Sequence, residues 1–391
     1  MLWVISCFVF VVSLAIGADA AVRTIVGSSV DASTPPPPLG CNSGSVFNMV
    51  ASGPINTFTT GLGSGNNPFV TGPLEDSYRG RGFNVASTST SGITLAQFAL
   101  TGFAFTGETA VSVAGSPDAA GAYNLLYDNT LQRVIYWSQQ VVAPCGGSAC
   151  LHVKAYTGNS GGSPSLILDN ALTLINVGSA NSQGGVADAS NYYITMPDAA
   201  GTPTRLYKLN KSLGSVGSVN ITNPSQDMVD DGSFLYTIDG ISNVIRRIEK
   251  TTLIVTSFTF GTVTNFTGGI DYHLNSDTLY ASGLVGGVQQ VVQILKSTMT
   301  IIGSVNINPE TVVLRGLRID QNADKLYAMT ANGASWAVRR MNLAPFANAQ
   351  TITNTDGGNT GWWMAPDFIH KALWFTDVDS PGHLHKVSLC S

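Results

Sequence analysis

The sequence predicts an all-β protein made of repeated four-stranded sheets, and three observations lead to this prediction. An apolar run ending in aspartate, a polar turn and an apolar-aromatic strand recur along most of the chain. Charged residues make up only 11% of the chain and there are 42 glycines, a composition that favours short strands and turns over helices. Further short strands follow each aromatic strand. Four short strands recurring about every 45 residues are typical of the blades of a β-propeller.

Three columns of residues define the repeat once its copies are aligned. The first column is an aspartate at the end of the first strand: Asp128, Asp188, Asp230, Asp271, Asp320 and Asp367. The second column is an aromatic residue on the next strand, with spacings of 57, 43, 44, 47 and 47 residues: Tyr136, Tyr193, Tyr236, Tyr280, Tyr327 and Trp374. The third column is a long polar side chain between apolar neighbours: Lys154, Lys208, Arg247, Gln293, Arg340 and Lys386.

These columns have structural interpretations that do not require a binding site. An aspartate at a hairpin turn can accept hydrogen bonds from backbone N–H groups two residues on, which fixes the turn. A long basic side chain can lay its stem along apolar surface between blades and keep its charged head in water. We therefore expect the columns to hold the fold together.

The number of blades depends on a weaker copy near the start of the repeats. Asp76 precedes Phe83 by seven residues, the same interval as in the copy at 317–330, and Gln97 stands where other copies have Lys or Arg. We expect seven four-stranded blades, with six blades and an N-terminal cap as the alternative.

The N-terminal residues predict export from the cell. Residues 1–20 contain an apolar run followed by Ala18-Asp19-Ala20, which is typical of a cleaved secretory signal, although an uncleaved anchor is the alternative. Residues 21–40 include four consecutive prolines and read as a linker. Residues 41–391 are expected to form the propeller domain. The mature protein should be secreted, with no membrane span after signal cleavage.

The last repeat has three strands and lacks a fourth. We expect the segment 45–51 to supply it and so to close the ring by pairing with the last blade. The four cysteines of the mature chain allow three pairings, and export favours disulfides. Cys145 and Cys150 lie close enough to bridge one hairpin loop, which leaves Cys41 to join Cys390 at the seam.

Three segments of the chain resemble a known superfamily. The stretches "DNTLQRVIYWSQ", "LYTIDGISNVIRRIEK" and "ALWFTDVDSPGHLHKV" are similar to blades of the YWTD and NHL propellers. The resemblance covers about residues 120–390 and extends weakly to residue 74. It implies the propeller architecture, whereas the complete YWTD tetrapeptide does not occur in this sequence.

Sites of chemistry are few in the sequence. Asn210, Asn220 and Asn265 begin N-glycosylation sequons. Asp377, Asp379, His383 and His385 cluster near the C-terminal end but match neither a calcium loop nor a zinc site, so an exposed hairpin turn is expected. The adjacent Trp362 and Trp363 are both expected to pack in the core, and the alternative is that one packs between blades while the other stacks on a sugar or apolar ligand.

Two functional hypotheses follow. The first is a secreted, non-catalytic binding or adhesion module, monomeric, whose partner is an extracellular protein or a glycan. The second is a calcium-dependent hydrolase of the lactonase or esterase type, with carboxylates meeting in the central channel. No catalytic residue and no required cofactor is predicted, although calcium belongs to the second hypothesis. The net charge of −5 makes nucleic acid an unexpected partner.

Overall fold

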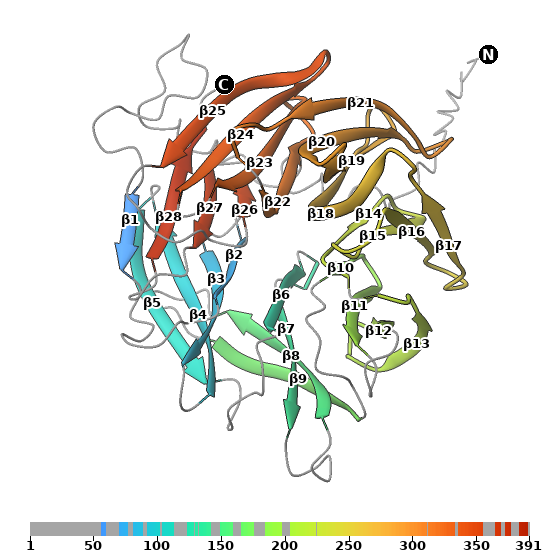
Figure 1. Cartoon of the computed structure of the whole chain (residues 1–391). Helices are drawn as coiled ribbons and strands as arrows, with labels where there is room; N and C mark the ends of the chain where they lie inside the picture. Colours follow the sequence, from blue (N-terminus) through green and yellow to red (C-terminus); the bar gives the residue numbers. More distant parts are fainter. Residues whose placement is uncertain are drawn as a thin grey trace, which may run out of the picture.

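The computed structural model is built from β-strands arranged around a central axis (Figure 1). It describes residues 56–59, 70–76, 81–88, 92–101, 104–112, 123–128, 130–131, 133–141, 149–158, 166–175, 184–197, 204–223, 225–310, 312–332, 335–354, 364–368, 372–376 and 383–389. This described part contains no helix with the length and apolar character that a membrane span requires.

The strands form seven antiparallel four-stranded sheets, numbered here I to VII along the chain. Sheet I consists of β2 (Val70–Asp76), β3 (Arg81–Thr88), β4 (Gly92–Thr101) and β5 (Ala104–Ser112). Sheet II consists of β6 (Tyr123–Asp128), β7 (Arg133–Val141), β8 (Ala149–Gly158) and β9 (Leu166–Ile175). Sheet III consists of β10 (Gly185–Ala187), β11 (Asn191–Pro197), β12 (Thr204–Asn210) and β13 (Ser215–Asn220).

The remaining sheets repeat this order. Sheet IV consists of β14 (Asp227–Asp230), β15 (Phe234–Ile238), β16 (Val244–Glu249) and β17 (Val255–Thr259). Sheet V consists of β18 (Val263–His273), β19 (Thr278–Val285), β20 (Val288–Leu295) and β21 (Thr300–Asn306). Sheet VI consists of β22 (Val312–Asp320), β23 (Lys325–Asn332), β24 (Ser335–Leu343) and β25 (Phe346–Asn354). Sheet VII consists of β26 (Met364–Asp367), β27 (Ala372–Thr376), β28 (His383–Ser388) and β1 (Asn56–Thr59).

The first strand of each sheet lies nearest the axis (Figure 1). Each of these inner strands contacts the inner strand of the next sheet, and β2 also contacts β26. The all-β propeller prediction is therefore confirmed.

Sheet VII differs from the others in how it obtains its outer strand. Its order is β1-β28-β27-β26, so a strand from the start of the described chain lies outermost, with Asn56 opposite Lys386. The segment 45–51, which was expected to supply this strand, lies outside the described residues. The strand that pairs with β28 instead begins at Asn56. A pairing strand of four residues is too short to show a clear alternating pattern in the sequence.

The aromatic column and the long polar column face each other across the second and third strands. Tyr136 lies opposite Lys154, Tyr193 opposite Lys208, Tyr236 opposite Arg247, Tyr280 opposite Gln293, Tyr327 opposite Arg340, and Trp374 opposite Lys386. In sheet I, Phe83 lies opposite Gln97. The alignment of these two columns is correct in every sheet, because the register of a hairpin follows its hydrophobic pattern.

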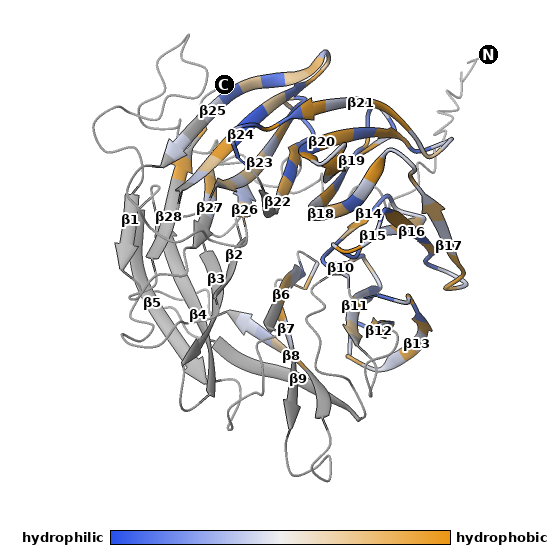
Figure 2. Ribbon diagram, in the orientation of Figure 1, coloured by the Kyte–Doolittle hydropathy of each residue, from blue (hydrophilic) through white to orange (hydrophobic). Residues whose placement is uncertain are grey.

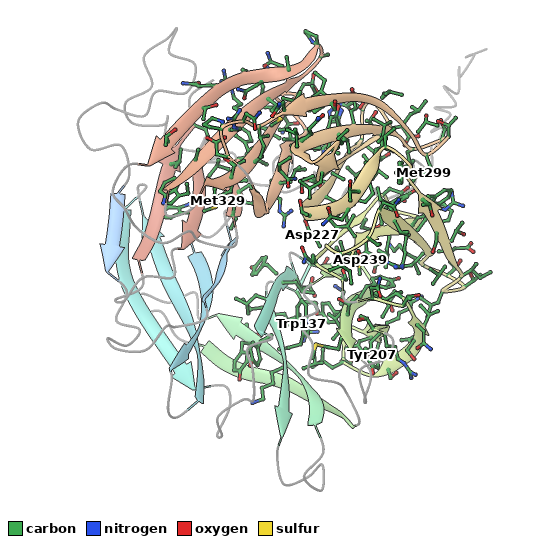
Figure 3. All side chains as sticks on the ribbon, viewed as in Figure 1. Trp137, Tyr207, Asp227, Asp239, Met299 and Met329 are labelled. Carbon is green, nitrogen blue, oxygen red and sulfur yellow. The ribbon has the colours of Figure 1, made fainter. Side chains whose placement is uncertain are left out.

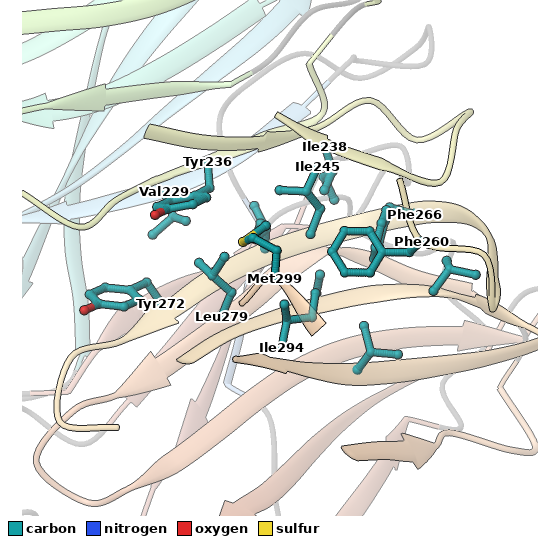
Figure 4. Close-up of a cluster of buried hydrophobic side chains, with 14 residues drawn as sticks. Val229, Tyr236, Ile238, Ile245, Phe260, Phe266, Tyr272, Leu279, Ile294 and Met299 are labelled. Carbon is teal, nitrogen blue, oxygen red and sulfur yellow. The ribbon is translucent and has the colours of Figure 1, made fainter. Parts of the chain in front are cut away.

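The core lies between neighbouring sheets. Apolar and polar residues alternate along the strands of sheets V and VI, so each sheet presents apolar faces to its neighbours (Figure 2). Between sheets IV and V, a cluster of buried side chains from both sheets includes Tyr236, Ile245, Phe266 and Met299 (Figure 4). The rings of Phe260 and Phe266 meet edge to face in this cluster at 5.3 Å.

The aspartate column needs corrections in sheets IV and V. In sheet IV the position that corresponds to Asp320 is held by Asp231, which accepts the N–H groups of Ser233 and Phe234, and Asp230 is its neighbour. The carboxylates of Asp128, Asp188, Asp230 and Asp320 accept turn N–H groups, as expected for turn aspartates. Asp271 does not belong to this set, because it lies opposite Tyr280 in the middle of its strand. The position that corresponds to Asp320 in sheet V is occupied by His273, because His273 lies opposite Thr278 across a turn of the same length as the one between Asp320 and Lys325. The side chain of Asp367 lies outside the described residues.

Candidate functional site

Among the described side chains of the inner strands, the most concentrated charge comes from Asp227 on β14, Asp271 on β18 and Arg318 on β22. Arg318 Nη1 lies 3.1 Å from Asp227 Oδ2 and also donates to the carbonyl of Leu317 at 2.6 Å. Asp227 and Asp271 are buried, whereas the Arg318 side chain retains 20% of its exposure. Figure 3 shows Asp227 on the axial side of its sheet. We call these three residues the axial cluster.

The two axial carboxylates join neighbouring inner strands. Asp227 Oδ2 accepts the N–H of Ile270 on β18 at 3.1 Å, and Asp271 Oδ2 accepts the N–H of Ile319 on β22 at 2.9 Å. An inner strand has an unpaired edge, and a buried N–H without a partner costs free energy. The carboxylates therefore complete the hydrogen bonding that the sheets themselves leave open.

The arginine balances this negative charge. Burial alone would lower the pKa of Arg318, but Asp227 and Asp271 outweigh it, so the pKa of the guanidinium is raised. Arg318 reaches past β18, because it starts on sheet VI and bonds a carboxylate of sheet IV. One carboxylate thus ties three consecutive sheets.

The axial cluster does not match the arrangement that the hydrolase hypothesis requires. That hypothesis needs several carboxylates and an asparagine converging on a cation. Within the described residues, no group of three or more His, Cys, Asp or Glu side chains could hold a metal ion. The two axial carboxylates instead face a guanidinium and backbone N–H groups.

A second set of charges links neighbouring sheets through their turns. Three lysines follow the third strand of their sheets and reach back to a turn aspartate of the preceding sheet. Lys211 Nζ lies 2.9 Å from Asp128 Oδ2, Lys250 Nζ lies 2.8 Å from Asp188 Oδ2, and Lys296 Nζ lies 2.9 Å from Asp231 Oδ2. We call these three contacts the lysine junctions.

The lysine junction between sheets III and IV is the most enclosed. Lys250 keeps 7% exposure and contacts a second carboxylate, Asp230, at 2.9 Å. Burial alone would lower the pKa of Lys250, but the two carboxylates outweigh it and raise the pKa. Burial alone would raise the pKa of Asp188, but Lys250 and the N–H groups of the turn outweigh it and lower the pKa.

The junction between sheets V and VI is built differently. His273 takes the place of the turn aspartate, and its Nε2 lies 3.0 Å from Asp324 Oδ1 on the next sheet. Its Nδ1 lies 2.8 Å from Ser276 Oγ in its own turn. His273 is 5% exposed but Asp324 is 59% exposed. In the lysine junctions the acid belongs to the earlier sheet and the lysine to the later one. Here the acid, Asp324, belongs to the later sheet and faces solvent.

The Ser276, His273 and Asp324 side chains do not form a productive Ser–His–Asp triad. In such a triad the acid is buried and orients Nδ1, whereas Nε2 receives the serine proton. Here the serine faces Nδ1 and an exposed acid faces Nε2. We interpret the three residues as a link between turns.

The third-column side chains were expected to keep their heads in water, and several of them instead make contacts inside the protein. Arg247 stacks on Phe234 and Phe258, with its guanidinium carbon 4.8 and 5.2 Å from the ring centres. Lys208 Nζ bonds the carbonyl of Lys250 at 2.7 Å, and Gln293 Nε2 donates to the hydroxyl of Tyr280 at 2.9 Å. Arg340 is buried. The side chain of Lys386 is outside the described residues.

The three sequon asparagines differ in their surroundings. Asn210 and Asn220 are exposed at the ends of β12 and β13. Asn220 Oδ1 accepts a hydrogen bond from Arg205 Nε at 3.2 Å. Asn265 is half-buried, with Nδ2 3.4 Å from the carbonyl of Gly240. An exposed amide is required for glycan attachment, so Asn210 and Asn220 remain the stronger predictions.

Several predicted features lie outside the described residues. These are Cys41, Cys145 and Cys390, the side chain of Cys150, Trp362, Trp363, Asp377, Asp379, and the side chains of His383 and His385. The disulfide pairings therefore stay predictions.

Two functional features were missed at the level of sequence. A Lys followed by Ser or Thr recurs after the third strand, at Lys211, Lys250 and Lys296, and an alignment of the turns would have found it. Arg318 has no counterpart in the other copies, so the repeat gave no reason to select it.

Comparisons with known proteins support the fold and go no further. No protein-family model matches the sequence, and no curated protein matches it. The β-propeller domain of Cps50 (Swd1) from Myceliophteria thermophila is similar in structure, with a TM-score of 0.56 and 8% identity over 86% of this chain and 99% of that one. A chain of the mitotic checkpoint complex has a TM-score of 0.60 and 10% identity over 93% of this chain and 99% of its own.

At such low identity these similarities establish only a β-propeller. The resemblance to YWTD and NHL propellers stays a prediction.

Proposed function

We propose that the protein is a secreted, non-catalytic propeller that serves as a rigid binding module for an extracellular protein or a glycan. In this proposal, seven blades form one ring, which is sealed by β1 and by a disulfide between Cys41 and Cys390. The fold supports a binding role, because one similar structure is a β-propeller domain and the other is a chain of a named protein complex.

The observation that carries the proposal is the use made of the axial carboxylates. The Oδ2 atoms of Asp227 and Asp271 each accept a hydrogen bond from a backbone N–H of the next sheet, and Asp227 also binds Arg318. A calcium site would need these oxygens as ligands, since Ca²⁺ takes six to eight oxygen ligands. The cluster is therefore better suited to holding the ring than to binding calcium.

The first experiment separates the two functional hypotheses. Calcium is titrated into the purified, secreted chain by calorimetry, and hydrolysis of a lactone and an aryl ester is measured with calcium and with chelator. We expect no saturable calcium heat and no hydrolysis above that of an Asp271→Asn control. Calcium-dependent hydrolysis that Asp271→Asn removes would establish the hydrolase instead.

The second experiment tests binding directly. The chain is expressed with its own N-terminal segment in cultured cells, recovered from the medium and labelled. We expect saturable binding to the surface or matrix of cells of the source organism, competed by unlabelled protein and unchanged by chelator. Retention of the chain inside the cells would contradict secretion, and linear, uncompeted binding would contradict the binding role.

A further inference from the structure

The outer strands of sheets III, IV and V carry no charged residue. Strands β13, β17 and β21 have the sequences SVGSVN, VTSFT and TIIGSVN. Among the strands that the structure describes, each is the last in the order of its sheet and is hydrogen-bonded to one neighbouring strand. Each therefore presents a row of backbone N–H and C=O groups at the rim of the ring (Figure 1).

Such edges are usually protected. Soluble proteins place Lys, Pro or inward-pointing charges on edge strands, because an open edge can pair with a strand of another chain. Within the same ring, β5 contains Glu108 and β9 contains Asp169. Strands β13, β17 and β21 have none of these residues, and neither do the outer strands β25 and β1.

Two of the open edges match each other in sequence and register. Residues 217–220 on β13 and 303–306 on β21 both read Gly-Ser-Val-Asn. Gly217 lies opposite Lys208 and Gly303 lies opposite Gln293, which are equivalent positions of the repeat. The preceding residues, Val216 and Ile302, are both aliphatic and both 54% exposed.

We propose that the β13 edge of one copy of this chain pairs with the β21 edge of a second copy, so that the two sheets become continuous. The occupant is a second copy because the paired edges are uncharged and carry matching Val, Ile, Ser and Asn residues. Although the chain has a net charge of −5, none of its charged side chains stands on either edge, so identical chains meet without repulsion there.

This pairing is heterologous, since it joins two different edges of the same chain. A heterologous contact leaves one β13 edge and one β21 edge free in every dimer, so assembly continues into open chains. The monomer expected from the sequence is then the state at low concentration.

A glycan would control this assembly at one edge only. Asn220 ends β13 and begins a sequon, whereas the equivalent Asn306 on β21 is followed by Ile307 and Asn308 and begins none. A glycan on Asn220 would cover the β13 edge and leave the β21 edge open. We expect the glycosylated chain to stay monomeric and the enzymatically deglycosylated chain to associate.

The test uses lysine on each edge, with a matched control. Ser218→Lys blocks β13 and Ser304→Lys blocks β21, and both replaced serines are exposed. Asn275→Lys adds the same charge to an exposed turn of sheet V, away from the edge. Sedimentation velocity of the glycan-free chain over a wide concentration range is the readout, and thermal unfolding shows that each variant is folded. Ile302→Lys is a second variant for the β21 edge.

We expect the wild type and Asn275→Lys to form species that grow with concentration, and each edge variant alone to lose them. An equal mixture of Ser218→Lys and Ser304→Lys keeps one intact edge of each kind, so it should form dimers that do not grow further. A wild type that is monomeric at every concentration would overturn the proposal. Association that survives in both edge variants, or that is lost in Ser218→Lys but kept in Ser304→Lys, would also overturn it.

Discussion

The lysine junction between sheets III and IV and the histidine junction between sheets V and VI both link neighbouring sheets through their turns. They differ in how deeply the paired groups are buried. At the first, buried Lys250 lies between Asp188 and Asp230. At the second, buried His273 faces an acid that is mostly in water. Removing one partner of a buried ion pair strongly destabilises a protein, whereas an exposed ion pair contributes little to its stability. We infer that sheets III and IV depend on charge, and that sheets V and VI depend on packing.

Packing between sheets V and VI is close along the inner strands. Tyr280, Val291 and Leu317 belong to one buried cluster that spans the two sheets. A Cβ placed on Gly269 would lie 2.8 Å from Leu317 Cβ, so β18 and β22 approach too closely for any side chain at this position. This close packing can hold sheets V and VI together, where the histidine junction has no ion pair with both partners buried.

Removing Lys250 should have the largest effect. Lys250→Met leaves Asp188 and Asp230 buried without their cation, which costs about 3–5 kcal/mol in similar cases. Urea unfolding at neutral pH measures the loss. Lys325→Met, at a half-buried strand position, is the control and should change stability by less than about 1 kcal/mol. A loss for Lys250→Met as small as the control's would contradict the charge dependence of this junction.

Acid should weaken the lysine junctions next. The pKa of Asp188 in the junction is lowered in the folded protein, and so is the pKa of Asp239, a buried carboxylate that pairs with Arg246 within sheet IV. Such groups stabilise the fold above their unfolded pKa, and this contribution is lost as the pH falls through the folded pKa. The free energy of unfolding should be flat between about pH 5 and 7 and should fall below about pH 4, with each such carboxylate contributing up to about 2–3 kcal/mol.

The comparison with Lys250→Met sharpens this result. In that variant Asp188 has lost the cation that lowers its pKa, so the acid slope of the unfolding free energy should be shallower. Urea unfolding at a series of pH values measures both slopes. Equal slopes would show that the junction does not carry the acid sensitivity.

Crowding the close contact between sheets V and VI should have an intermediate effect. Gly269→Ala places a methyl group against Leu317, and overpacking of this kind costs about 1–3 kcal/mol. Thermal unfolding measures the change. Gly261→Ala, where a Cβ would meet nothing within 4 Å, is the matched control. No difference between the two variants would argue against packing as the basis of this junction.

Breaking the histidine link should have the smallest effect. His273→Gln keeps a side chain able to hydrogen-bond, and the partner carboxylate of Asp324 is already hydrated, so we expect a loss below about 1 kcal/mol. Urea unfolding in low and high salt is the measurement. A loss as large as that of Lys250→Met would show that the two junctions are alike after all.

Much of the fold could be predicted because it repeats. The pairing of Tyr236 with Arg247, and its equivalents in the other sheets, followed from a pattern that recurs with the same strand spacing. The turn roles of Asp188 and Asp320 followed from local chemistry, since an aspartate can fix a turn within its own neighbourhood. Asp271 was misplaced because the turn position of this copy is held by His273 and the nearest aspartate lies two residues earlier, so matching by residue type shifted the alignment.

The sequence by itself determined the repeat, the strand register and the way in which aspartates fix the turns. Each of these depends on residues close together in the chain. Tertiary structure alone decided which turn aspartate receives which lysine, that Arg318 crosses a neighbouring strand to Asp227, and that His273 faces an exposed acid. It also decided that β1 begins at Asn56 and lies beside β28. These contacts join residues that are tens to hundreds of positions apart, and their partners are selected by the geometry of the ring, which local patterns do not encode.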